Sequence, residues 1–243
     1  MRIAVWHNLP SGGGKRALYD HVRGLIARGH SVEAWCPPTA DRAYLPLAGL
    51  IPEHVVPLRW HTGGLGKLHP LYWSMGAKVR AMDEHCRLCA GQMGAGGFDV
   101  LYGASCFLFT TTSIARQSSL PSLLYLQEPN RPMYEAIPEL IWAAPKLDGS
   151  VWRPANLRRW LQNTAFMLML RVKVRAELDN AAAYDRILVN SYFSRESVLR
   201  TYGLDARVCY LGVDTERFSD RGLGREDFVM GIGAITPAKN VHF

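Results

Sequence analysis

The sequence alternates short apolar runs with longer segments of helical periodicity, and this alternation constrains its fold more than any other feature. Residues 2–6 form a short apolar run, a glycine loop follows, and apolar residues then recur at helical spacing over 18–26. Gly29 follows the last apolar position, where a left-handed helix cap is common, and 31–36 supplies a second strand that Pro37 ends. This first segment therefore predicts a right-handed βαβ unit.

The same alternation continues to residue 211. We expect strands near 54–58, 98–102, 121–126, 185–190 and 207–211, and helices at 71–93, 107–117, 151–183 and 194–202, the last capped through Ser191 or Ser194. Strands separated by helices form parallel sheets whose two faces are both covered. The predicted fold class is therefore α/β, a Rossmann-like doubly wound parallel sheet.

The sequence after this alternating region predicts a domain boundary. A polar segment at 215–227 is the best candidate linker, and 228–232 follows as a new buried strand. A strand and a turn cannot bury their own apolar faces. We therefore expect an N-terminal domain over 1–216, and over 217–243 a linker with the first strand and turn of a second, truncated Rossmann-like domain.

Composition and charge describe a soluble globular protein with an anionic partner. Hydrophobic residues make up 48% of the chain and charged residues 20%, and no apolar run is long enough to span a bilayer. The N-terminus has no signal-peptide pattern, which favours a cytosolic protein. The net charge of +7 indicates nucleic acid, a phosphorylated small molecule or an anionic membrane as partner. No nucleic-acid recognition motif is present, so nucleic acid is the weakest of these.

The cysteines predict neither a disulfide framework nor a metal site. Five cysteines, an odd number, are scattered through a long chain, which indicates reduced thiols. Cys86 and Cys89 form a single C-x-x-C without a second pair, so a metal or redox role for them is a weak alternative.

The glycine loop between the first strand and the first helix is the first candidate site. At Gly12, Gly13 and Gly14 an unhindered backbone can approach a ligand closely, and the free N–H groups of a helix start favour an anion. Lys15 and Arg16 add positive charge. The loop lacks the G-x-G-x-x-G spacing of dinucleotide sites, and Arg16 stands where a Walker A loop needs serine or threonine.

A second candidate site follows the strand expected at 121–126. The apolar run stops at a polar cluster that Pro129 and Pro132 keep out of regular secondary structure, and this cluster contains Gln127, Glu128, Asn130 and Arg131. In parallel α/β sheets ligands bind beyond the carboxyl ends of the strands. An ordinary loop with an internal ion pair between Glu128 and Arg131 is the alternative.

Taken in order, these motifs resemble family 4 glycosyltransferases of the GT-B fold. They are the Gly-Gly-Gly loop, Tyr-Leu-Gln-Glu-Pro-Asn-Arg at 125–131, Val-Asn-Ser-Tyr-Phe-Ser-Arg at 189–195, Gly-Val-Asp at 212–214 and Gly-Ala-Ile-Thr-Pro-Ala-Lys-Asn at 233–240. The resemblance implies a retaining enzyme of polysaccharide biosynthesis. Such an enzyme moves a hexosyl group from a nucleotide-sugar donor to a sugar or lipid-linked acceptor, without a metal or another cofactor.

The resemblance also implies roles for particular residues. Gln127 stands where many relatives have a histidine, and because glutamine cannot transfer protons near neutral pH we assign it to sugar orientation, with Glu128 beside it as the second catalytic residue. Lys239 matches the lysine that neutralises the donor diphosphate. The predicted substrate-binding residues are Gly12, Gly13, Gly14, Lys15, Asn130, Arg131, Tyr134, Ser191 and Arg195.

Two departures from the family pattern limit this prediction. Ala234 stands where relatives carry the arginine that accompanies the lysine, and the family's glutamate pair would lie beyond Phe243. We therefore expect the 243-residue chain by itself to be inactive.

Residues 151–183 support an alternative class of function. This segment combines six arginines and lysines with tryptophan, leucine and phenylalanine, a composition typical of helices that lie on anionic membranes. The chain would then be a non-catalytic module that binds anionic lipid or a sugar-phosphate, or a cytoplasmic enzyme peripheral at the inner membrane face. A surface helix with solvated arginines explains the same composition.

Overall fold

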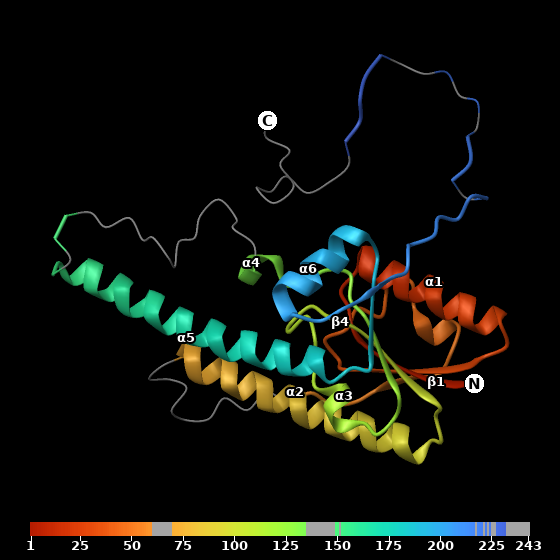
Figure 1. The fold of residues 1–243 in the computed structure, drawn as a ribbon, viewed down its shortest axis with the longest axis horizontal. Coiled ribbons are helices and arrows are strands. Elements are labelled where there is room, and N and C mark those ends of the chain that lie inside the picture. Colours follow the sequence, from red (N-terminus) through yellow and green to blue (C-terminus); the bar gives the residue numbers. More distant parts are fainter. Residues whose placement is uncertain are drawn as a thin grey trace.

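The computed structural model describes residues 1–59, 70–134, 149–150 and 152–216, and residues 218–220, 222, 224 and 227–231 of the C-terminal tail. These residues form one parallel sheet with helices on both faces, and the tail leaves the sheet near its last strand (Figure 1).

The sheet has seven strands, and every neighbouring pair is parallel. Their order is β3-β2-β1-β4-β5-β6-β7, so the direction of strand addition reverses between β1 and β4. The strands are β1 (Arg2–Asn8), β2 (Ser31–Cys36), β3 (Glu53–Val55), β4 (Val100–Cys106), β5 (Ser122–Tyr125), β6 (Arg186–Val189) and β7 (Arg207–Val208). This arrangement confirms the predicted Rossmann-like doubly wound sheet, although β4 begins two residues later than predicted and continues to Cys106.

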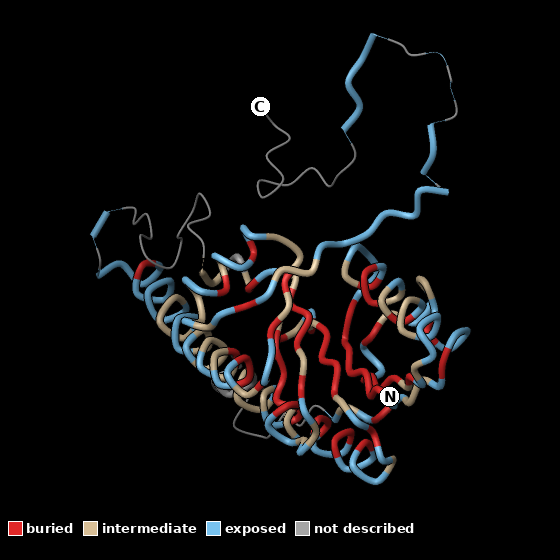
Figure 2. Tube along the Cα trace, turned by 45° about the vertical axis from the view of Figure 1, so that its right-hand side comes forward, coloured by how far each residue is buried: buried red, intermediate tan, exposed pale blue. Residues whose placement is uncertain are grey.

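The helices divide between the two faces of the sheet, and each face has its own apolar core. Helix α1 (Gly13–Ala27) covers one face, together with the short 3-10 helix η1 (Leu47–Gly49). Helices α2 (Pro70–Ala95), α3 (Ile114–Gln117), α5 (Pro154–Ala182) and α6 (Tyr192–Tyr202) lie on the other face, and α4 (Arg131–Tyr134) follows β5. Figure 2 shows the buried strands between these two exposed outer layers.

The predicted βαβ unit is present at the start of the chain. β1 and β2 pair in parallel, and α1 connects them. Gly29 has a φ of 79°, and the N–H groups of Gly29 and His30 bond to the carbonyls of Ile26 and Leu25. This is a glycine-dependent Schellman cap, as the sequence predicted.

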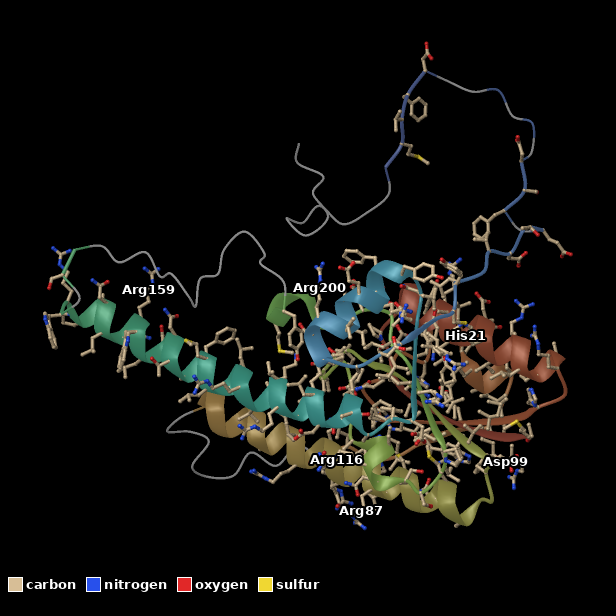
Figure 3. All side chains as sticks on the ribbon, viewed as in Figure 1. His21, Arg87, Asp99, Arg116, Arg159 and Arg200 are labelled. Carbon is tan, nitrogen blue, oxygen red and sulfur yellow. The ribbon has the colours of Figure 1, made fainter. Side chains whose placement is uncertain are left out.

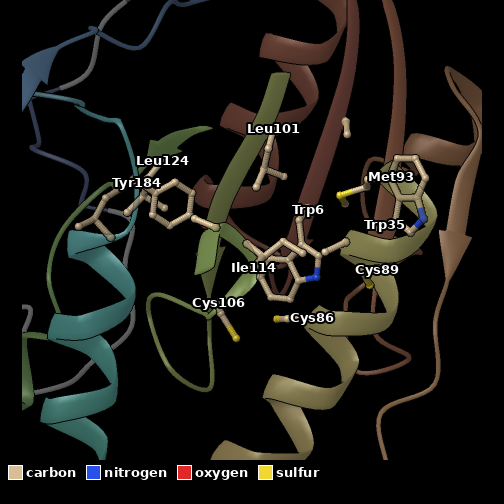
Figure 4. Close-up of a cluster of buried hydrophobic side chains, with 14 of the residues drawn as sticks. Trp6, Trp35, Cys86, Cys89, Met93, Leu101, Cys106, Ile114, Leu124 and Tyr184 are labelled. Atoms are coloured by element: carbon tan, nitrogen blue, oxygen red, sulfur yellow. The ribbon is translucent and has the colours of Figure 1, made fainter. Parts of the chain in front are cut away.

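The C-x-x-C pair belongs to the core beneath α2. Cys86 and Cys89 are fully buried free thiols that lie near Trp6 and Met93 (Figure 4). Burial raises the pKa of both, to about 12 for Cys89, so these thiols stay protonated at neutral pH. Their position indicates packing rather than redox chemistry.

The helix predicted over 107–117 was wrong for most of its length. Only Ile114–Gln117 is helical, because the chain turns directly after β4. The backbone N–H of Cys106 donates to the carbonyl of Thr110, and the N–H of Thr110 donates to the carbonyl of Cys106. Thr110 has a positive φ of 57°. This tight turn excludes helical geometry at 107–113.

The strand predicted at 228–232 was also wrong over its described part. Phe228, Val229 and Met230 have no strand structure and are largely exposed. The segment pairs with none of the seven strands of the described sheet. Apolar composition alone does not make a strand without a neighbour to pair with.

Candidate functional site

The candidate site lies at the carboxyl edge of the sheet, where the strand order reverses between β1 and β4. Asn8 ends β1, and its side chain bonds to Cys106 Sγ at the end of β4 (3.4 Å) and to Thr39 Oγ1 (3.1 Å). The backbone of Phe107 also donates to the carbonyl of Asn8. These bonds fix the two strand ends that border the crevice in which doubly wound sheets bind their ligands.

The start of α1 presents unpaired backbone N–H groups to this crevice. Gly12 has a φ of 138° and a ψ of −165°, which only glycine adopts readily, and no side chain of the described residues caps the helix. The first turn also contains no acidic residue. An uncapped helix start with this dipole favours a bound anion, as the sequence predicted.

The side chain of Gln127 lies against this helix start. A β-carbon built on Gly14 would be 3.4 Å from Nε2 of Gln127 and 3.7 Å from its Oε1. Gln127 follows β5 and is half-buried, so its amide points toward the glycine loop and not into the core. The structure thus brings the two predicted site segments together.

We call residues 126–134, which follow β5, the β5 exit loop. Apart from Gln127, some of its described residues are exposed to solvent and others pack against the protein. Glu128 is exposed, and Asn130 is half-buried. The ring of Tyr134 packs edge-on against Tyr202 of α6, with centroids 5.8 Å apart, and burial raises the pKa of its hydroxyl. Tyr134 therefore anchors the loop, while substrate contact by Glu128, Asn130 and Tyr134 stays a prediction.

Ser191 and Arg195 follow β6, the next strand of the sheet. The Ser191 hydroxyl accepts a hydrogen bond from the Ser194 backbone N–H (3.1 Å), which confirms Ser191 as the cap of α6. Arg195 instead bonds to Asp205 through Nε and Nη2, at 3.0 and 2.8 Å. Substrate binding by these two residues also stays a prediction. The Arg131 side chain and Lys239 lie outside the described residues.

Lys15 lies beneath the site rather than on its surface. Its side chain is fully buried, and Nζ has no hydrogen-bond partner among the described residues. Burial lowers the pKa of this amine. The nearby Glu53 carboxylate acts in the opposite direction and raises it, but burial is the larger effect. Substrate contact by Lys15, which the sequence predicted, stays a prediction.

A buried polar cluster surrounds Lys15. His7 lies 3.2 Å from Oε1 of Glu53, and Arg42 lies 3.3 Å from Oε2. Burial lowers the pKa of His7 and raises that of Cys36 to about 12, so both are neutral at pH 7. Burial opposes ionisation of Glu53, but the hydrogen bond from His7 and the nearby cations hold its pKa below the usual value. The Asp41 carboxylate also lies near Lys15, so the cations Lys15 and Arg42 are balanced by the carboxylates of Glu53 and Asp41.

The same cluster has the ligand types of a metal site but unsuitable electrostatics. Ligand atoms of His7, Cys36 and Glu53 lie within 4.8 Å of one another. However, Arg42 and Lys15 already lie beside the Glu53 carboxylate and would repel a divalent cation. Cys36 would also have to lose a proton that burial favours. We assign no metal to it, and the expected absence of a metal or cofactor stays a prediction.

His7 and Glu177 were not predicted from the sequence, although each carried a readable signal. Strand alternation places His7 on the same face as Val5, which α1 covers. Glu177 stands in line with Val174 and Ala181 at helical spacing, so it is a carboxylate on an apolar stripe. Both side chains are almost fully buried. An ionisable side chain at a strand or helix position that faces the core is the sequence signal for both residues.

Sequence comparison identifies the family of the chain. The family described as Glycosyltransferase Family 4 matches residues 11–217, most of the chain. The chain therefore belongs to glycosyltransferase family 4, and its sheet is the Rossmann-like sheet expected of a GT-B N-terminal domain. No curated protein sequence matches it.

Several solved structures are similar to the chain at low identity. HepE from Anabaena, in complex with UDP and glucose, is 15% identical (TM-score 0.45, covering 91% of this chain and 48% of that one). UGT2 from Phytolacca americana is 16% identical (TM-score 0.47, 93% and 55%), and MurG from Acinetobacter baumannii is 12% identical (TM-score 0.45, 88% and 47%). The chain thus spans about half the length of each of these proteins.

None of the helices among the described residues combines the length and the apolar composition that crossing a bilayer needs.

Proposed function

We propose that the whole protein is a retaining glycosyltransferase that moves a hexosyl group from a nucleotide-sugar donor to a sugar or lipid-linked acceptor. One observation carries this proposal beyond family membership. The Gln127 amide faces the uncapped start of α1, so a hydrogen-bonding group for a sugar lies next to an anion-binding backbone.

In this mechanism the chain contributes orientation and charge, not proton transfer. The N–H groups of the first turn of α1 stabilise negative charge that develops on the leaving diphosphate, and the buried amine of Lys15 adds to that field. Gln127 holds a hydroxyl of the transferred sugar, and Glu128 shapes the same pocket. Lys239 would neutralise the diphosphate from the second domain.

Replacing Gln127 with alanine should lower kcat/KM of the full-length enzyme about tenfold, the effect of one lost hydrogen bond to the reacting sugar. Gln127→His should retain transfer, because histidine also reaches a sugar hydroxyl. Gln117→Ala is the matched control, since it removes an exposed glutamine at the end of α3. Initial rates with varied donor concentration measure the effect, and unchanged rates for Gln127→Ala would contradict the assignment.

A second function, contact with an anionic membrane, is favoured by the N-terminal half of α5. This half extends beyond the sheet, and Figure 3 shows Arg159 there, away from the body of the domain. Trp160 and Leu161 are each 54% exposed, and the sequence from Gly149 to Ala176 contains no acidic residue. Exposed apolar side chains between arginines fit the interface of an anionic bilayer.

Changing Arg158, Arg159 and Arg171 to glutamine together should weaken binding to phosphatidylserine vesicles at least tenfold, because each surface cation contributes roughly 1 kcal/mol. The binding of the unchanged protein should also weaken as salt rises. Arg23, Arg87 and Arg200 are exposed arginines on other helices and provide a control with the same change of charge. Vesicle cosedimentation measures both, and equal loss in the two triple variants would remove a specific role for α5.

A further inference from the structure

We propose that Glu177 is a positioning residue for the proposed transfer reaction and holds the β5 exit loop in place. This inference rests on the proposed function. Glu177 lies on α5, far from the loop in sequence, and only 1% of the residue is exposed. A carboxylate is rarely buried to this extent unless other groups require it there.

The contacts of Glu177 join three segments around the site. Its Oε1 accepts a hydrogen bond from the hydroxyl of Tyr202 on α6. The backbone N–H of Asn130 in the β5 exit loop and the hydroxyl of Thr110 in the turn after β4 face the carboxylate and favour its charged form, while Oε2 has no direct hydrogen-bond partner among the described residues. Thr111 donates to the Glu177 carbonyl at 2.9 Å. One residue of α5 therefore contacts the turn after β4 directly and the β5 exit loop through its charge and through Tyr202, which packs against Tyr134.

A short segment connects Asn130 to Gln127, the residue that we assign to sugar orientation. Asn130 lies three residues after Gln127, and Pro129 between them is buried. Tyr134 ends the same loop and packs against Tyr202, the residue that also bonds to Glu177. Release of Asn130 would therefore free the loop between the end of β5 and Tyr134, and with it the contact of Gln127 with Gly14.

The strength of this attachment depends on the charge of Glu177. Burial raises the pKa of this carboxyl to about 7, while Tyr202, Lys173, Asn130 and Thr110 favour the charged form. Tyr134 also faces it, and Cys106 lies near Lys173. A carboxylate accepts hydrogen bonds more strongly than a carboxylic acid does, so the loop is held best above pH 7.

The test uses the full-length enzyme with Glu177→Gln, a neutral side chain of the same shape. For the unchanged enzyme we expect kcat/KM to rise through pH 7. In the variant this rise should be absent, and the value at pH 8 about tenfold lower, with the loss in kcat because the loop orients the sugar. Tyr202→Phe removes one donor to the carboxylate and should move the transition to higher pH.

Hydrogen exchange separates this inference from the proposed function. At pH 8 the amides of residues 126–134 should exchange faster in Glu177→Gln than in the unchanged protein, and Glu196→Gln, which removes an exposed carboxylate of α6, should have no effect. If the unchanged enzyme transfers no sugar, the proposed function fails while the exchange result still decides the role of Glu177. Equal exchange and an unaltered pH profile in Glu177→Gln would overturn the inference.

Discussion

Replacing Gly14 with valine is expected to reduce glycosyl transfer about tenfold, as much as loss of the Gln127 side chain, while the domain stays folded. A β-carbon at this position would already lie 3.3 Å from Leu9 Cδ2 and 3.4 Å from Gln127 Nε2. The two further methyl groups of valine would overlap the Gln127 amide and push it away from the helix start. The loss should match that of Gln127→Ala, because either change removes the same hydrogen bond to the reacting sugar. Steady-state kinetics and circular dichroism measure the two parts of this prediction.

Two comparisons isolate the cause of this loss. Gly91→Val places the same side chain on an exposed position of α2 where a β-carbon would meet nothing within 4 Å, and activity should be unchanged. In the Gly14→Val background, Gln127→Ala should cost less than about twofold, because the amide is already displaced. A full tenfold further loss in the double variant would show that the two residues act independently.

The fold was predictable because it follows from local patterns. Strand, glycine loop and helix in the first βαβ unit each have a chemical signal, and the left-handed cap at Gly29 could be placed to the residue. The turn at 107–113 was not recognised, although the three threonines and the serine at 110–113 have low helix propensity. The bonds between Cys106 and Thr110 and the contact of Thr111 with α5 decide its structure, and these depend on tertiary packing.

The site was predictable only in outline. A polar loop after a buried strand and a glycine loop after the first strand both belong at the carboxyl edge of a parallel sheet, which placed Gln127 and Gly14 near each other. The burial of Lys15 depends on Glu53 and His7, which neighbouring strands bring beneath α1. The distances between Lys15, Glu53 and His7 cannot be read from the spacing of these residues in the sequence. The pairing of Arg195 with Asp205 was missed for the same reason.

The stability of the domain is expected to fall as pH rises, because of Glu177. Its pKa is about 7 in the folded chain against an ordinary value of 4.5, so the folded state binds this proton more tightly than the unfolded state does. The contribution to stability is therefore complete below pH 4.5 and is lost as pH rises through 7. Between pH 5 and pH 8 the loss is on the order of 2–3 kcal/mol. Urea unfolding at pH 5, 6, 7 and 8 measures it.

Glu177→Gln should abolish this pH dependence and make the domain more stable than the unchanged protein at pH 8, because glutamine fills the same space without a buried charge. Glu196→Gln should leave the slope unaltered, since that carboxylate is exposed and paired with Arg200. A variant that is more stable but transfers sugar more slowly would show that the charge is retained for the position of the β5 exit loop and not for folding. If stability and transfer fall together in Glu177→Gln, the carboxylate serves the fold alone.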